Sequence, residues 1–288
     1  MQDRLDPLIA ERAPWLFSRR PGTAVARRLL NRVLGYDHTI ALAERFRDMP
    51  SDQIMAAMAK LLARDVEVAG LGHIPRHGAA LVVANHPTGI ADGIMLHHLI
   101  AGLRGDAFYF ANHDILRVLP QMHDMIAPVE WRPEKRSHSK TRETMDYTRA
   151  AVAEGRLGVI FPSGRLAKRR GLSLHERPWM ASAAMIARKF DLPVIPVNIR
   201  ARNSALFYLF DLIHPTLRDI TLFHETLNKD RQPYRVTVGE PISPSALPAK
   251  SEDGIAMLRR ATLALGGSKA PAVSLVDSSR RPSWMRAT

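Results

Sequence analysis

The chain has 288 residues, of which 46% are hydrophobic and 24% are charged, so it is long enough to bury a large core. It contains no cysteine, which excludes disulfide bonds, thiolate metal ligands and a cysteine nucleophile. The 41 Lys and Arg residues outnumber the 28 Asp and Glu residues, and the net charge of +13 predicts an anionic partner: nucleic acid, lipid head groups or an acidic carrier protein.

Residues 1–63 are expected to form a basic helical region ahead of the main domain. Within 23–47 the apolar residues recur at helical spacing with arginines between them, and 52–64 repeats this period. No secretory signal is expected at the N-terminus, and no apolar run reaches the roughly 18 residues that a membrane span needs. These helices are therefore expected either to pack on the main domain or to lie on a membrane surface.

From residue 64 to residue 267, short β-rich runs alternate with helical patterns. Strands are expected at 66–68, 80–84, 108–111, 126–129, 157–161, 193–199 and 234–238. Helices are expected at 91–103, 140–154, 178–190 and 252–265. This alternation predicts a mixed α/β fold whose largely buried sheet is flanked by helices. The polar residues 268–288 are expected to form a flexible tail.

The first candidate site lies where the expected strand at 80–84 ends in Asn85 and His86, a few residues before Asp92. Sheet proteins form clefts at such strand ends. A histidine backed by a carboxylate is the minimum arrangement for general-base catalysis, because the imidazole removes a proton and the carboxylate orients and stabilises the ring. Five residues separate the pair, and an unusual backbone conformation at Gly89 would absorb that spacing. Taken alone, a histidine near an aspartate is more often structural.

The second candidate site follows the expected strand at 157–161. Its residues are Phe161, Pro162, Ser163, Gly164, Arg165 and, slightly later, Lys168. Backbone N–H groups in a tight turn, together with a guanidinium, suit a phosphate or carboxylate group. Taken alone, this pattern fits a solvated run of charge better.

Together these segments resemble the four-block pattern of the lysophospholipid acyltransferase family, which includes the 1-acylglycerol-3-phosphate acyltransferases. The blocks here are Asn85-His86-Pro87 with Asp92, Phe161-Pro162-Ser163-Gly164-Arg165, Val194-Ile195-Pro196-Val197 and Val238-Gly239-Glu240-Pro241-Ile242. The family is marked by His-x4-Asp and Phe-Pro-Glu-Gly-Thr-Arg. This chain is similar to a subgroup with five residues between the His and the Asp, and Ser163 stands where glutamate is usual.

The resemblance implies that 64–267 is an acyltransferase domain. It implies transfer of a fatty acyl group from acyl carrier protein or acyl-CoA to the free hydroxyl of a lysolipid, with no cofactor and no metal. His86 would be the catalytic base and Asp92 its partner. The residues implied to bind substrate are Asn85, Asn112, Phe161, Pro162, Ser163, Gly164, Arg165 and Lys168. The expected acceptor is lysophosphatidic acid or a related monoacylated lipid, and the alternative is lyso-ornithine lipid or another lyso-aminolipid.

Charge and resemblance together predict a peripheral protein of phospholipid biosynthesis, held on the cytoplasmic face of the cell membrane by anionic lipid. The alternative from another class is a non-catalytic basic protein that binds membrane or nucleic acid. Nucleic acid is not expected, because aromatic and basic residues do not interleave as in RNA-binding modules. A serine hydrolase would need a Gly-x-Ser-x-Gly elbow, which does not occur. His73 and His77 are four apart, but Pro75 interrupts this metal-like spacing.

Overall fold

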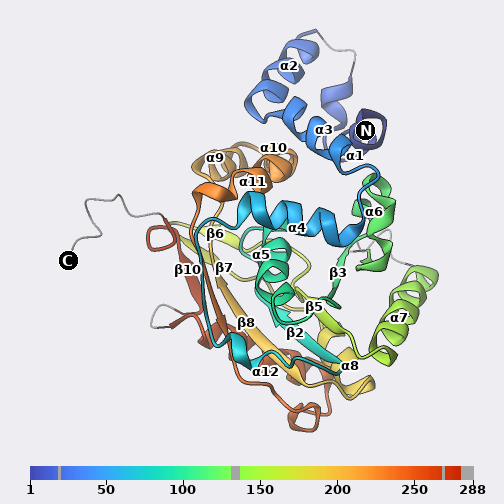
Figure 1. Ribbon diagram of the computed structural model, residues 1–288. Helices are drawn as coiled ribbons and strands as arrows, with labels where there is room; N and C mark the ends of the chain where they lie inside the picture. The colour runs from blue at the N-terminus through green and yellow to red at the C-terminus, as the bar shows by residue number, and fades with distance from the viewer. Residues whose placement is uncertain (19–20, 131–136, 268–269, 280–288) are drawn as a thin grey trace.

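A seven-stranded sheet forms the centre of the computed structural model, which describes residues 1–18, 21–130, 137–267 and 270–279 (Figure 1). In spatial order its strands are β1 (Val66–Ala69), β9 (Tyr234–Val238), β8 (Val194–Arg200), β2 (Ala80–Ala84), β5 (Leu157–Ile160), β3 (Phe108–Asn112) and β4 (Ile126–Val129). The strands from β8 to β4 are parallel, whereas β9 runs antiparallel to β8 and parallel to β1. Every strand expected from the sequence is present, with ends that differ by no more than one residue.

Helices cover both faces of this sheet. The helices are α1 (Gln2–Arg12), α2 (Thr23–Val33), α3 (Tyr36–Arg45), α4 (Ser51–Leu62), α5 (Ile90–Ala101), α6 (Asp114–Val118), α7 (His138–Ala153), α8 (Ser182–Lys189), α9 (Ala205–Ile213), α10 (Pro215–Ile220), α11 (Leu222–Leu227) and α12 (Ser251–Ala264). One face packs against α4 and α5, and the other against α7, α8 and α12. The mixed α/β fold with a buried sheet between helices is confirmed.

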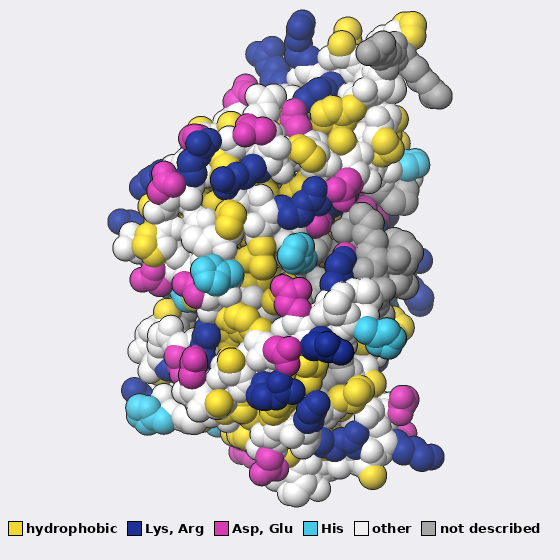
Figure 2. All heavy atoms as spheres, turned by 90° about the vertical axis from the view of Figure 1, so that its right-hand side faces the viewer, with side chains coloured by type: hydrophobic (Ala, Val, Ile, Leu, Met, Phe, Trp, Pro, Cys, Tyr) yellow, Lys and Arg dark blue, Asp and Glu magenta, His cyan; other side chains and the backbone are white. Residues whose placement is uncertain are grey.

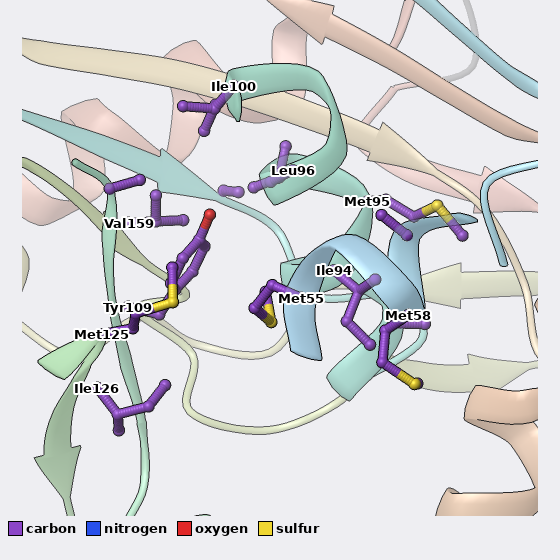
Figure 3. Packing of buried hydrophobic residues seen from close by; sticks show 14 of the residues in the cluster. Met55, Met58, Ile94, Met95, Leu96, Ile100, Tyr109, Met125, Ile126 and Val159 are labelled. Atoms are coloured by element: carbon purple, nitrogen blue, oxygen red, sulfur yellow. The ribbon is translucent and has the colours of Figure 1, made fainter. Parts of the chain in front are cut away.

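Strand β2 explains how the sheet is buried on both faces. All five of its residues are buried, and alternate side chains enter different cores: Val82 faces α4 and α5, whereas Leu81 and Val83 face α8 and α12. On the first face, Met55 of α4 lies near Ile94 of α5 (Figure 3). A strand that is apolar along its whole length therefore occupies the middle of the sheet.

The helix expected at 178–190 begins at Ser182, so this prediction was wrong at its N-terminal end. The reason lies in the backbone before it: the Met180 N–H donates to the Pro162 carbonyl at 2.9 Å. That contact fixes the segment against the loop after β5. The chain can therefore turn into a helix only after Met180.

A second sheet and the short helices α9, α10 and α11 were not expected. The small antiparallel sheet has the order β10 (Ala272–Ser274), β7 (Ser173–His175) and β6 (Lys168–Arg170). Its core consists of Leu174, Val273 and two side chains of α9, Phe207 and Tyr208. Strand β10 belongs to the segment expected to be a flexible tail, of which 268–269 and 280–288 lie outside the described residues. The division of the chain at 63 and 267 stays a prediction.

The N-terminal helices α1 to α3 gather at one end of the molecule, next to α10 and α6 (Figure 1). Helix α2 contains no buried residue. Its apolar side chains Val25, Leu29 and Val33 are exposed by 71%, 62% and 43%. In the described part of the chain, no helix combines the length and apolar character needed to cross a bilayer.

Candidate active site

The two candidate motifs meet at one edge of the sheet. His86 follows β2 and Phe161 follows β5, and because these strands are parallel neighbours their carboxyl ends lie side by side. The two rings stack, with centroids 4.3 Å apart and planes inclined by 28°. The Ala167 N–H also donates to the His86 carbonyl at 2.9 Å. The loop after β5 is therefore fixed against the histidine through both a side chain and its backbone.

His86 and Asp92 form a close pair. Nδ1 of His86 lies 3.0 Å from Oδ2 of Asp92, although the ring is turned so that the two atoms do not align as a hydrogen bond. The aspartate side chain is fully buried, whereas 18% of the histidine side chain is exposed. Because Nδ1 itself is buried, solvent reaches the histidine at other atoms. The imidazole is thus open to a substrate while its Nδ1 edge faces the carboxylate.

Gly89 makes the five-residue spacing workable. Its backbone has φ +100° and ψ −136°, which is accessible essentially only to glycine, as expected from the sequence. A Cβ atom there would lie 3.1 Å from Cδ2 of Leu166, so the loop after β5 also packs tightly on this turn. The turn places Asp92 in the first turn of α5.

The Asp92 carboxylate is held by three donors at the start of α5. Oδ2 accepts from the backbone N–H groups of Thr88 (2.9 Å) and Gly89 (3.0 Å), and Oδ1 accepts from the Thr88 hydroxyl (2.5 Å). These bonds satisfy the buried carboxyl group with hydrogen-bond donors at the positive end of the α5 dipole. The Thr88 hydroxyl also contacts the hydroxyl of Tyr234 at 2.5 Å. Burial raises the pKa of Tyr234 well above its ordinary value, so this hydroxyl stays protonated.

Two expected substrate-binding residues use their amides on the protein itself. The buried Asn85 donates to the Ile199 carbonyl at 2.9 Å and accepts from the Ile199 N–H at 2.6 Å, which joins the end of β2 to β8. Asn112 donates to the Asp114 carboxylate at 3.1 Å and accepts from the Asp114 N–H at 3.0 Å. Its strand, β3, is separated from β2 by β5. Both amides therefore stabilise the backbone at the end of a strand.

The loop after β5 turns its cationic side chains outward. Pro162 and Ser163 are buried, and the Ser163 hydroxyl donates to the Arg165 carbonyl at 2.8 Å. Gly164 has φ +59° and lies so close to Met180 that a Cβ would come within 3.0 Å of its methyl group. Arg165 and Lys168 are exposed. The arrangement can present positive charge to an anionic group near His86.

Glu176 is a site residue that sequence reasoning missed. Its Oε2 accepts the backbone N–H of His86 at 3.1 Å, and its Oε1 accepts the indole N–H of Trp179 at 2.9 Å. Burial is the main effect on this carboxyl group and raises its pKa. The available signal was an acidic residue three positions before a tryptophan in an otherwise basic stretch.

A buried ion pair lies behind Asp92 and left no signal in the sequence. Nζ of Lys229 lies 3.2 Å from Oε2 of Glu225, and their side chains are 0% and 1% exposed. Glu225 also accepts from the backbone N–H (2.8 Å) and hydroxyl (2.5 Å) of Ser204. The neighbouring Asn203 donates to the Thr88 carbonyl at 3.4 Å, so the network extends to the turn that holds Asp92. Within the described ranges, no group of three or more His, Cys, Asp or Glu side chains is placed to hold a metal ion.

Comparison with known proteins gives four relevant matches. Residues 65–200 match the family model described as Acyltransferase. A lyso-glycine lipid O-acyltransferase of Phocaeicola vulgatus is 25% identical over 195 residues, covering 65% of this chain and 68% of that protein. One of the same name from Bacteroides thetaiotaomicron is 20% identical over 244 residues, covering 83% and 87%. The crystal structure of the 1-acyl-sn-glycerophosphate (LPA) acyltransferase PlsC from Thermotoga maritima shares the fold, with a TM-score of 0.50 and 16% identity over 86% of this chain and 98% of that one.

Proposed function

We propose that this chain is an O-acyltransferase of the lysophospholipid acyltransferase family, which transfers a fatty acyl group from a thioester to the free hydroxyl of a lysolipid. One observation carries the proposal. An accessible imidazole, His86, lies 3.0 Å from a fully buried carboxylate, Asp92, at the carboxyl edge of the central sheet. Transfer to a hydroxyl needs a base at such a position.

In the proposed reaction, His86 removes the proton of the acceptor hydroxyl. The oxygen attacks the thioester carbonyl, the carbon–sulfur bond breaks, and the imidazolium returns the proton to the departing thiolate. Asp92 holds the ring and stabilises the imidazolium, and Phe161 supports the ring plane from one side. The misaligned Nδ1–Oδ2 contact is of the kind that tightens when substrate binds. General-base assistance of this type contributes about 10²–10⁴ in rate.

The acceptor that we favour is a lyso-aminolipid with an anionic head group, and lysophosphatidic acid is the second candidate. The two sequence relatives that cover most of the chain are both named for lyso-glycine lipid. Carboxylate and phosphate groups are both recognised by guanidinium and ammonium groups. We therefore place the head group against the exposed side chains of Arg165 and Lys168.

The donor is proposed to be acyl carrier protein or acyl-CoA. Both candidates carry negative charge, and the net charge of +13 favours their approach. On the face shown in Figure 2, acidic and basic side chains are interspersed, so the excess positive charge there does not form one continuous patch. On this face, interspersed charge suits transient contact with a donor better than tight wrapping by nucleic acid.

We further propose that the protein lies on the cytoplasmic face of the cell membrane, with α2 in contact with lipid. The exposed side chains Val25, Leu29 and Val33 are spaced four residues apart and form one face of this helix. Arg28 and Arg32 belong to the same helix, and each basic residue near an anionic surface contributes about 1 kcal/mol. An apolar face bordered by arginines fits a peripheral helix in the plane of the interface.

The proposed function is tested by offering the purified protein a panel of lysolipids with each thioester donor and identifying products by mass spectrometry. Wild-type protein should acylate at least one acceptor, and His86→Ala should lose that activity while keeping its fold. His98→Ala is the matched control, since His98 is exposed on α5. Full activity of His86→Ala would contradict the catalytic role, and no turnover of any acceptor by wild type would contradict the proposed function.

A further inference from the structure

Glu176 contacts the backbone of the proposed base, His86, and has no role in the reaction described above. Glu176 is 8% exposed, and its Oε2 lies 3.1 Å from the backbone nitrogen of His86. That nitrogen belongs to the turn that leads from β2 to α5. The position of the imidazole therefore depends on this carboxyl group as well as on Asp92.

The surroundings of Glu176 call for a carboxyl group and no other side chain. Its two oxygens accept from two N–H donors, the His86 backbone at 3.1 Å and the Trp179 indole at 2.9 Å. A carboxylate only accepts hydrogen bonds, whereas a glutamine would turn an NH₂ group toward one of these donors. Burying the carboxyl group costs solvation free energy, and its two hydrogen bonds offset part of that cost.

Two further contacts fix Glu176 itself. It directly follows β7, and its backbone carbonyl accepts from Nη2 of Arg259 in α12 at 3.0 Å. A few residues later the Met180 N–H donates to the Pro162 carbonyl. The segment 176–180 is therefore anchored to α12 at one end and to the loop after β5 at the other.

The segment 176–180 contacts both motifs of the candidate site. At its start, the Glu176 carboxyl group accepts the backbone N–H of His86 at 3.1 Å. At its end, the Met180 N–H donates to the Pro162 carbonyl at 2.9 Å, in the loop after β5. Glu176 therefore joins the backbone of His86 to a segment that is itself bound to that loop.

We propose that Glu176 is a positioning residue for acyl transfer, which fixes the His86 backbone relative to the segment 176–180 and, through Met180, to the loop after β5. This inference rests on the proposed function, because it assigns Glu176 a role in placing the base of that reaction. It predicts an effect on kcat rather than on acceptor binding, since the buried carboxyl group of Glu176 binds the His86 backbone and the Trp179 indole, whereas Arg165 and Lys168 are exposed.

The experiment compares wild type, Glu176→Gln, Trp179→Phe and, as a matched control, Glu143→Gln, whose side chain is exposed on α7. Glu176→Gln should lower kcat by about 10- to 100-fold, because small displacements of a catalytic group have effects of this size, and should leave the acceptor KM within about twofold. Trp179→Phe keeps the carboxyl group and should lower kcat less. Glu143→Gln should match wild type.

A spectroscopic measurement separates positioning from general stabilisation. The amide proton of His86 donates to Glu176, so its NMR chemical shift in wild type should follow the ionisation of a carboxyl group and should lose this dependence in Glu176→Gln. A His86 amide that does not titrate in active wild-type protein, or a kcat for Glu176→Gln within twofold of wild type, would overturn the role of Glu176 and leave the proposed function standing. Wild-type protein without any acyl transfer would overturn both.

Discussion

Replacing Lys229 by methionine tests whether the buried ion pair behind Asp92 supports the fold. The ammonium group is fully buried and lies 3.2 Å from Oε2 of Glu225, whose side chain is 1% exposed. Removing one partner of such a pair typically costs about 3–5 kcal/mol, because the other charge remains buried without its counter-ion. Glu225 keeps three hydrogen-bond donors, two from Ser204 and one from Asn228, so the loss should lie near the lower end, at about 3 kcal/mol.

The assay is urea denaturation, in which the free energy of unfolding is obtained from the midpoint and the slope. The double variant Glu225→Gln/Lys229→Met removes both charges and should recover more than half of the loss. Lys60→Met on the exposed side of α4 is the control and should change stability by less than about 0.5 kcal/mol. A loss below about 1 kcal/mol for Lys229→Met, or a double variant no more stable than the single one, would refute the reasoning.

Four further predictions follow from the site and the surface. Asp92→Asn should lower kcat by up to about 10⁴-fold in a steady-state thioester assay, because the amide cannot fix the ring and accept all three donors. Asn85→Ala should lower the free energy of unfolding in urea by about 2–4 kcal/mol, since both backbone groups of Ile199 lose their buried partner. Burial raises the pKa of Glu176 above its ordinary value of 4.5, so the folded protein binds this proton more tightly than the unfolded chain does. The resulting contribution to the free energy of unfolding is present below pH 4.5 and is lost as the pH rises through the folded-state pKa. Urea denaturation across this pH range should show that loss for wild type and not for Glu176→Gln. Leu29→Glu on α2 should weaken sedimentation with anionic vesicles, and unchanged binding would remove α2 from the membrane surface.

The central sheet was predictable because its strands depend on local pattern. Strand β2 is apolar throughout, and the chain around it contains clear turn residues, so its ends could be placed to the residue. The β6–β7 hairpin could not be found in this way, because Lys168, Arg169 and Arg170 read as a solvated charge run. Its single buried residue, Leu174, has its apolar partners on β10 and α9, far away in the sequence.

In the candidate site, too, contiguous motifs were predictable and contacts between distant residues were not. The pairing of His86 with Asp92 and the neighbouring loop at Phe161 were expected, since each motif is contiguous and the two lie at the ends of parallel strands. The acyltransferase resemblance of these motifs agrees with the match of residues 65–200 to the family model described as Acyltransferase. Glu176 and Lys229 were missed because their partners are distant in the chain: the hydrogen bond from His86 to Glu176 spans 90 residues.

The charges around Asp92 suggest why a buried carboxylate is retained at this position. Its hydrogen-bond donors, two backbone N–H groups and the Thr88 hydroxyl, carry no formal charge. The nearby charge of Glu225 is offset by Lys229. The imidazolium formed in the proposed reaction would therefore meet a negative charge only 3.0 Å away, already held in place before the proton moves. Charged and polar groups that are already in place usually make the largest electrostatic contribution to stabilising a transition state. Asp92 has this property because it caps α5 and also faces the proposed base.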